Sequence, residues 1–241
     1  MNYACYNYPG GELVTPQEFI KRATPDYKNK GIFPYCEACG ERVDLYGVHN
    51  PNGPSRFDHP NLPAEANPLD DCVLANRNKR FRGMQPSGFD LKHGQQLREE
   101  FYKITFIKKT YHFMWALCGR NNFPISKFES ILKRAEKKKI WAYKDIMLWT
   151  IPYILLTFEN FKYTSGIEFH FYIDKNKTTF INEIWNHPGK TFLCKVFSDT
   201  TKLIKSSHYN PLSINKDNFE KISQDYNFIK DEQLSNILKL I

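Results

Sequence analysis

The sequence predicts an α+β protein with a loop-rich N-terminal module, a helical middle and a C-terminal antiparallel sheet with terminal helices. Three observations lead to this prediction. Ten of the 14 prolines fall within residues 1–90, apolar residues recur at helical spacing over residues 91–150, and β-branched and aromatic runs dominate residues 151–241. We therefore expect two domains, residues 1–90 and residues 91–241.

One helix is expected within the first module. Thr15 can cap a helix that starts at Pro16, and Glu18 completes a capping box three residues after the cap. Turn sequences such as Pro-Gly-Gly at residues 9–11 and His-Pro-Asn-Leu-Pro at residues 59–63 exclude long helices from the remainder. The module therefore buries little apolar surface and needs another source of stability.

Residues 91–150 show the periodicity of two amphipathic helices. The first helix carries one apolar stripe, formed by Leu97, Phe101, Ile104, Tyr111 and Trp115. Gly119 should end that helix. The capping-box pair Ser126 and Glu129 predicts the start of a second helix, which ends in the basic run 137–139.

The last segment changes to the pattern of strands. The expected strands are Tyr153–Phe158, Ile167–Ile173, Thr179–Trp185 and Thr191–Phe197. We predict an antiparallel meander of three or four strands from them. Two short helices should follow, around Lys216–Ser223 and Asp231–Leu240, and Asp231 should cap the latter.

The net charge of +8 comes almost entirely from the middle of the chain. Residues 77–139 contain 16 Lys or Arg against 5 Asp or Glu. A basic surface around residues 77–139 suits a polyanion such as nucleic acid, although lysine-rich helix faces can also be simply solvated.

The sequence gives no indication of a membrane segment or a secretory leader. The most apolar window, Ile146–Phe158, is shorter than the ~20 residues of a membrane-spanning helix, and the first residues lack a signal-peptide layout. We expect a cytoplasmic protein without a membrane partner.

The cysteines indicate a metal site. Cys36 and Cys39 form a Cys-x-x-Cys pair followed by Gly40, and His59 and Cys72 complete a Cys₃His set suited to structural Zn²⁺. His49 is an alternative to His59 as the histidine ligand. The remaining cysteines are scattered among apolar residues, as is typical of buried thiols rather than of a disulfide scaffold. We therefore predict a zinc-stabilised N-terminal module.

A compact basic run follows the cysteine and histidine set. Its predicted nucleic-acid-binding residues are Arg77, Lys79, Arg80, Phe81 and Arg82. The four cations can contact phosphates, and Phe81 can either stack on a base or anchor the loop to the core.

The same residues resemble the N-terminal zinc module of the bacterial competence proteins of the CoiA type. That module has a Cys-x-x-Cys-Gly knuckle followed by a Phe-x-His segment and a further cysteine, matched here by residues 36–40, Phe57, His59 and Cys72. The likeness covers about forty residues. The acidic and lysine motif of the nuclease domain that usually follows is not traceable here, so that activity does not carry over.

A second resemblance is carried by Asp58-His59-Pro60 and by the run from Cys72 to Arg80, which contains Asn76 and Asn78. These segments are similar to the Asp-His pair, the proline-rich loop and the Asn-bearing helix of zinc-ribbon HNH endonucleases. The resemblance implies that Asp58 and Asn78, or Asn76 in its place, hold a divalent ion such as Mg²⁺ or Mn²⁺, and that His59 acts as the general base. The second Cys-x-x-Cys of such ribbons is missing. The two roles of His59 exclude each other, because a zinc-bound imidazole cannot also accept a proton from water.

Our principal expectation is a zinc-stabilised protein that binds nucleic acid or a nucleoprotein complex. The alternatives are a metal-dependent HNH-like endonuclease and a protein-interaction module whose basic face is incidental.

Overall fold

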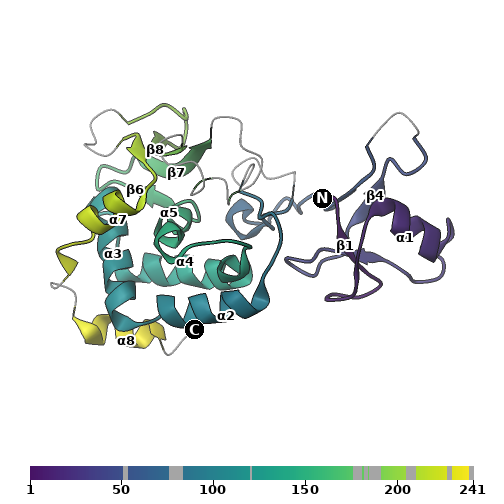
Figure 1. Ribbon diagram of the computed structural model, residues 1–241. Coiled ribbons are helices and arrows are strands. Elements are labelled where there is room, and N and C mark those ends of the chain that lie inside the picture. Colours follow the sequence, from purple (N-terminus) through teal and green to yellow (C-terminus); the bar gives the residue numbers. More distant parts are fainter. Residues whose placement is uncertain are drawn as a thin grey trace. The chain divides into compact units, whose positions relative to one another are not determined.

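The computed structural model divides the chain into two compact units, Met1–Arg82 and Gly83–Ile241. It describes residues 1–50, 54–75, 84–119, 121–175, 181, 184, 191–204, 210–226 and 230–238. The predicted domain boundary lies after residue 90, within the second unit. The structure confirms the α+β class, with helices in both units and antiparallel sheets (Figure 1).

The first unit contains short elements separated by turns. Its elements are β1 (Ala4–Tyr6), β2 (Leu13–Val14), α1 (Pro16–Ala23), β3 (Pro34–Tyr35), β4 (Asp44–Tyr46), β5 (Arg56–Asp58) and the 3₁₀ turn η1 (Pro68–Asp70). They form an antiparallel sheet of order β2-β1-β3 and a separate β4-β5 hairpin. The predicted capping box is present, because Thr15 accepts a hydrogen bond from the backbone of Glu18 and the Glu18 carboxylate accepts one from the backbone of Thr15.

An aromatic cluster forms the core of the first unit. Phe19 of α1 packs edge-on against Phe57 of β5, with ring centres 6.1 Å apart, and also contacts Tyr6 and Tyr27. Phe19 and Phe57 are fully buried. This contact holds α1 against β5, the strand that leads into His59.

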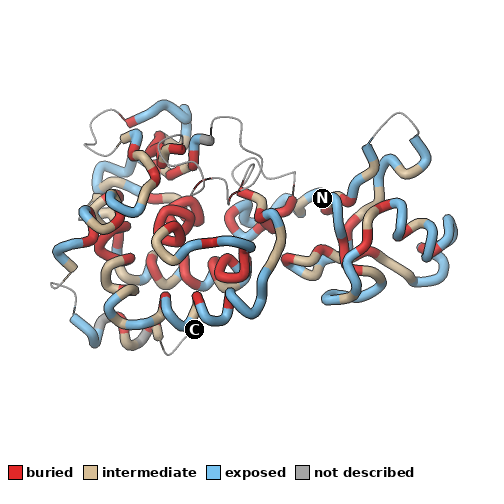
Figure 2. The backbone as a smooth tube through the Cα atoms, viewed as in Figure 1, coloured by how far each residue is buried: buried red, intermediate tan, exposed pale blue. Residues whose placement is uncertain are grey.

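The second unit consists of helices around a short, fully buried helix, with a sheet at one side (Figures 1 and 2). Its helices are α2 (Leu91–Phe101), α3 (Ile104–Cys118), α4 (Ile125–Lys137), α5 (Ile151–Leu156), α7 (Lys216–Ile222) and α8 (Asp231–Leu238), with the 3₁₀ turns η3 (Ile140–Ala142) and η4 (Leu148–Thr150). Its strands, in sheet order, are β6 (Asn160–Lys162), β7 (Glu168–Lys175), β8 (Thr191–Phe197) and β9 (Leu212–Ser213). Helix α5 packs against α3, α4 and β7.

The predicted strand Tyr153–Phe158 is wrong, because these residues belong to α5 and the turn after it. Every residue of α5 is buried, so the segment shows neither the two-residue period of a strand nor the polar face of a surface helix. Pro152 lies in the first turn of α5, where its missing N–H leaves no hydrogen bond unmade. A four-stranded antiparallel sheet is present, as expected, but β6 and β9 were not among the predicted strands and β7 pairs directly with β8.

The single helix predicted over residues 97–115 is divided in two. Helix α2 ends at Phe101, and Lys103 has extended backbone dihedrals (φ −60°, ψ 133°) before α3 begins. Phe101 packs on Trp141 with ring centres 4.5 Å apart, and the Tyr102 hydroxyl donates to Glu136 at 2.9 Å. These long-range contacts fix the chain at the break, and the local apolar period does not encode them.

Of the other predicted helix boundaries, the structure confirms one and contradicts another. Gly119 ends α3 in the left-handed region (φ 95°), as expected. The predicted start of α4 is wrong, because Pro124 precedes the first helical residue and Ser126 lies inside the helix. The predicted strand Thr179–Trp185 lies outside the described residues except for Ile181, in a turn, and Ile184, which is helical.

The remaining predicted elements agree with the structure, except that Asp231, expected to cap the last helix, is its first helical residue. Strands β7 and β8 cover Ile167–Ile173 and Thr191–Phe197 almost entirely, and α7 and α8 lie where the two terminal helices were expected. Along the described residues, no helix is both long enough and apolar enough to span a bilayer.

Candidate metal centre

Four predicted ligands from three separate segments of the first unit converge. The ligand atoms of Cys36, Cys39, His59 and Cys72 all lie within 4.8 Å of one another. The Cys36 and Cys72 sulfurs are 3.7 Å apart, and the Cys39 sulfur lies 3.3 Å from His59 Nε2. All the cysteines are free thiols, so no disulfide explains this convergence.

The Cys36–Cys39 knuckle is held by backbone hydrogen bonds. Gly40 N donates to Cys36 O at 2.9 Å, and Cys36 N donates to Glu41 O at 2.8 Å. Gly40 has φ +74°, which an L side chain rarely adopts, so the glycine after the second cysteine is required by the turn. This confirms the reason for which Gly40 was singled out in the sequence.

His59 reaches the cluster because it directly follows β5. Phe57 N donates to Met1 O at 2.9 Å, and β4 pairs with β5 on the other side. His59 is only 7% exposed, and its Nδ1 has no hydrogen-bond partner among the described residues. A buried imidazole with one unpartnered nitrogen and the other facing sulfur fits a metal ligand.

Cys72 is fixed by its own backbone neighbours. Asp71 Oδ1 accepts a hydrogen bond from Cys72 N at 2.8 Å, and Ala75 N donates to Cys72 O at 3.1 Å. Leu74 N donates to the Cys72 sulfur at 3.4 Å. These contacts cannot be predicted from the sequence, because backbone N–H groups leave no trace in residue type.

Each of the three sulfurs receives a backbone N–H. Besides the Leu74 bond, the N–H of Cys39 bonds to the Cys36 sulfur and the N–H of Glu41 bonds to the Cys39 sulfur. Hydrogen bonds of this kind favour the thiolate over the thiol. Hydrogen bonds to a ligand atom that stabilise its charged form are typical of metal sites.

The three neighbouring thiols shift one another's pKa values in opposite directions. Hydrogen bonds from Cys36 and then Cys72 hold the pKa of the Cys39 thiol well below its usual range. The hydrogen bond with Cys39 raises the pKa of Cys36 to about 12, and hydrogen bonding to Cys36 raises the pKa of Cys72. A divalent cation would favour the deprotonated form of all three thiols and release the protons that they still hold.

The donor set is compatible with metal binding. Two sulfurs on one tetrahedral zinc ion at ~2.3 Å each are about 3.8 Å apart, close to the observed 3.7 Å between Cys36 and Cys72. Three sulfurs and one imidazole nitrogen are the soft donors of closed, four-coordinate sites. Such a set leaves no position for substrate or water.

The structure distinguishes the two histidines that were considered as ligands. His49 is exposed and does not belong to the cluster, whereas His59 does.

The endonuclease residues are not brought together as that resemblance implies. Asp58 forms an ion pair with Arg56 at 2.6 Å, and the neighbouring His59 faces the cysteine sulfurs. Asn76 and Asn78 lie outside the described residues.

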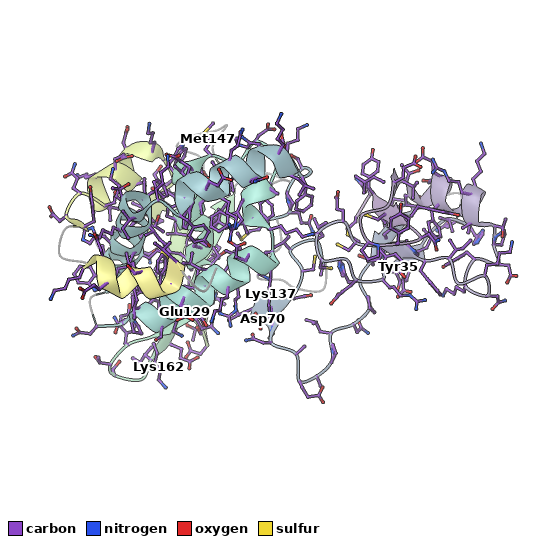
Figure 3. The ribbon with its side chains drawn as sticks, turned by 90° about the horizontal axis from the view of Figure 1, so that it is seen from below. Tyr35, Asp70, Glu129, Lys137, Met147 and Lys162 are labelled. Carbon is purple, nitrogen blue, oxygen red and sulfur yellow. The ribbon has the colours of Figure 1, made fainter. Side chains whose placement is uncertain are left out.

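The predicted basic surface is partly neutralised where the structure describes it. Seven of the 11 described cations between residues 84 and 139 form ion pairs: Arg98, Lys103, Lys108, Lys109, Lys127, Lys133 and Arg134. Figure 3 shows the side chains of α4, including Glu129 and Lys137. Some acidic partners come from later in the chain, such as Glu159, Glu220 and Asp231. The predicted contact residues Arg77, Lys79, Arg80, Phe81 and Arg82 lie outside the described residues.

Comparison with known proteins does not place the chain in a family. No protein-family model, no curated protein and no solved structure matches the chain.

Proposed function

We propose that the chain is a zinc-stabilised protein that binds nucleic acid, with Zn²⁺ held by Cys36, Cys39, His59 and Cys72. The convergence of these four ligands from separate segments is the observation that carries the proposal. The ion is structural, because four protein donors leave no open coordination position.

The contact with nucleic acid is assigned to residues 77–82, which begin five positions after the last ligand, Cys72. Residues Val73, Leu74 and Ala75 are buried, so the metal and this short segment anchor the chain just before the basic run. The ion pairs along α3 and α4 support a contact confined to this run rather than one spread over residues 77–139. Anchoring near the contact lowers the conformational entropy lost on binding.

Salt dependence tests this assignment. Four phosphate contacts predict that affinity for duplex DNA falls by about 100-fold between about 50 and 200 mM salt. A variant without the four cations should reduce the slope of log affinity against log salt by about 3 to 4. It carries Arg77→Gln, Lys79→Gln, Arg80→Gln and Arg82→Gln. Fluorescence anisotropy with labelled DNA and RNA of matched sequence gives both slopes.

A matched control removes the same charge elsewhere. It carries Lys103→Gln, Lys108→Gln, Lys109→Gln and Lys133→Gln, all at ion-paired positions. The control should keep most of the wild-type slope. Equal losses in both variants would contradict the assignment to residues 77–82, and a wild type without salt-dependent binding would favour the protein-interaction alternative.

The position of His59 argues against the endonuclease alternative. A general base needs a water molecule within hydrogen-bond reach, whereas His59 is buried and faces sulfur. Incubation of the same DNA and RNA with Mg²⁺ or Mn²⁺ should give no cleavage. Cleavage that is lost in Asp58→Asn would restore the endonuclease alternative.

A further inference from the structure

The four ligands differ sharply in their contact with solvent. Cys36 is fully buried, and Cys72 and His59 are 8% and 7% exposed. Cys39 is exposed. Of the three cysteines in the cluster, Cys39 is therefore the most accessible to a dissolved reagent, while the other two are shielded.

We propose that Cys39 is an oxidation site at which hydrogen peroxide releases the metal and joins Cys39 to Cys36 in a disulfide. The proposal rests on the proposed function in one respect, namely that the cluster holds zinc. It adds a modification site and a means of regulation that the binding function does not require.

The first step is a two-electron oxidation of one sulfur. The Cys39 thiolate attacks one oxygen of hydrogen peroxide, an S–O bond forms and the O–O bond breaks. The sulfur is oxidised to sulfenic acid, and the departing hydroxide takes up a proton and becomes water. Exposure directs this step to Cys39, since susceptibility follows thiolate character and accessibility.

The second step forms the disulfide. The Cys36 thiolate attacks the Cys39 sulfur, the S–S bond forms and the S–O bond breaks, and the hydroxide that leaves is protonated to water. In total, two thiolates, one peroxide and two protons give one disulfide and two waters. The metal then keeps only His59 and Cys72, and it dissociates because two ligands do not hold a structural zinc ion.

Cys36 is the expected partner because it lies on the same knuckle. Its sulfur is within 4.8 Å of the Cys39 sulfur, and only two residues lie between the two cysteines. Cys72 is equally within 4.8 Å but comes from a segment fixed by its own hydrogen bonds with Asp71 and Leu74. A local change of the knuckle turn therefore suffices for the bond to Cys36.

The test measures zinc release and cysteine oxidation in the full-length, zinc-loaded chain. Zinc content is determined first by elemental analysis, so that a chain without zinc counts against the proposed function and not against the oxidation step. Hydrogen peroxide is then added in increments, a chromophoric chelator records free zinc, and differential alkylation with mass spectrometry identifies the oxidised cysteines. We expect one zinc released per peroxide consumed, Cys39 as the first cysteine to lose reactivity, and a Cys36–Cys39 disulfide.

Two variants sharpen the test. Cys39→His keeps four potential ligands without the exposed thiol and should slow zinc release by at least about 10-fold. Cys5→Ser removes a buried cysteine outside the cluster and should leave the release rate unchanged. If Cys39→His fails to load zinc, the order in which the wild-type cysteines are oxidised still tests the proposal.

Three results would overturn the proposal. They are zinc retained while Cys39 is oxidised, zinc released while Cys39 stays reduced, and a first disulfide between Cys36 and Cys72. Loss of nucleic-acid binding is not used as the readout, so the oxidation site and the binding function are judged separately.

Discussion

The ammonium group of Lys195 lies over the Phe169 ring, with Nζ 4.0 Å from the ring centre. The same group donates to the carbonyl oxygens of Leu117 at 3.1 Å and Cys118 at 3.3 Å. These carbonyls belong to the last turn of α3, where helical hydrogen bonding ends and a cation is favoured. One buried lysine of β8 therefore ties the end of α3 to the sheet.

Lys195 should make the stability of the second unit depend on pH. Burial lowers the pKa of Lys195 to about 8 from its ordinary 10.5. Between these values the unfolded chain binds the proton more tightly, so the free energy of unfolding rises with pH, by up to ~1.4 kcal/mol per pH unit. Lys195→Met should abolish this rise while keeping most of the apolar packing.

Urea denaturation of both chains at pH values from about 7 to 10 checks the prediction. All four tryptophans lie beyond residue 83, so tryptophan fluorescence reports the second unit alone. The difference in unfolding free energy between wild type and variant cancels the contribution of other titrating groups. Parallel pH profiles for the two chains would contradict the prediction.

Removal of zinc should unfold the first unit and spare the second. The strands of the first unit have two or three residues each, so much of its stability should come from the metal. After addition of a chelator, proteolysis should cut within residues 1–82 while tryptophan fluorescence stays constant. A first unit that resists protease without metal would show that the aromatic cluster around Phe19 is sufficient.

His59→Ala and His49→Ala form a matched pair for the identity of the histidine ligand. His59 belongs to the cluster and His49 is exposed outside it. We expect one zinc per chain in the wild type and in His49→Ala. Zinc affinity should fall more than about 100-fold in His59→Ala, because loss of a ligand costs more than loss of an outer contact. Elemental analysis and competition with a chelator measure both, and full zinc retention in His59→Ala would remove this residue from the site.

Gly94→Ala should destabilise the second unit although alanine is the better helix former. A Cβ atom at Gly94 would lie 2.6 Å from the Cα of Ala142, which belongs to the backbone of η3. We expect a loss of about 1–3 kcal/mol, since the clash exceeds the ~1 kcal/mol gained in helix propensity. Gln96→Ala, at an exposed position of the same helix, should stay within about 0.5 kcal/mol of wild type in urea denaturation.

The elements predicted correctly from the sequence are those whose signals are local. The capping box of Thr15 and Glu18 and the turn at Gly40 each depend on residues a few positions apart. The four ligands could be proposed because paired thiols with a nearby histidine suit one ion, although spacing alone left His49 and His59 as alternatives. The fold distinguishes the two histidines, because His59 directly follows β5 and lies beside the knuckle, whereas His49 lies outside the cluster.

The features that could not be predicted from the sequence are those that distant residues determine. The pairing of Lys108 with Asp231 and of Lys109 with Glu220 reduces a charge excess that looks unbalanced along the sequence. Likewise, α5 is buried on all sides by elements from both ends of the second unit, so its own residues carry no period that identifies a helix. Packing of this kind overrides local propensity.

The distance along the chain between the ligands also sets an order of events during synthesis. Cys36 and Cys72, whose sulfurs lie 3.7 Å from each other, are 36 positions apart in the sequence. A growing chain exposes the Cys36–Cys39 pair first, and this pair alone holds an ion only weakly until the later ligands leave the ribosome. The proposed zinc ion would therefore complete the first unit only after Cys72 has been made, and the supply of zinc at that moment would govern how many chains mature.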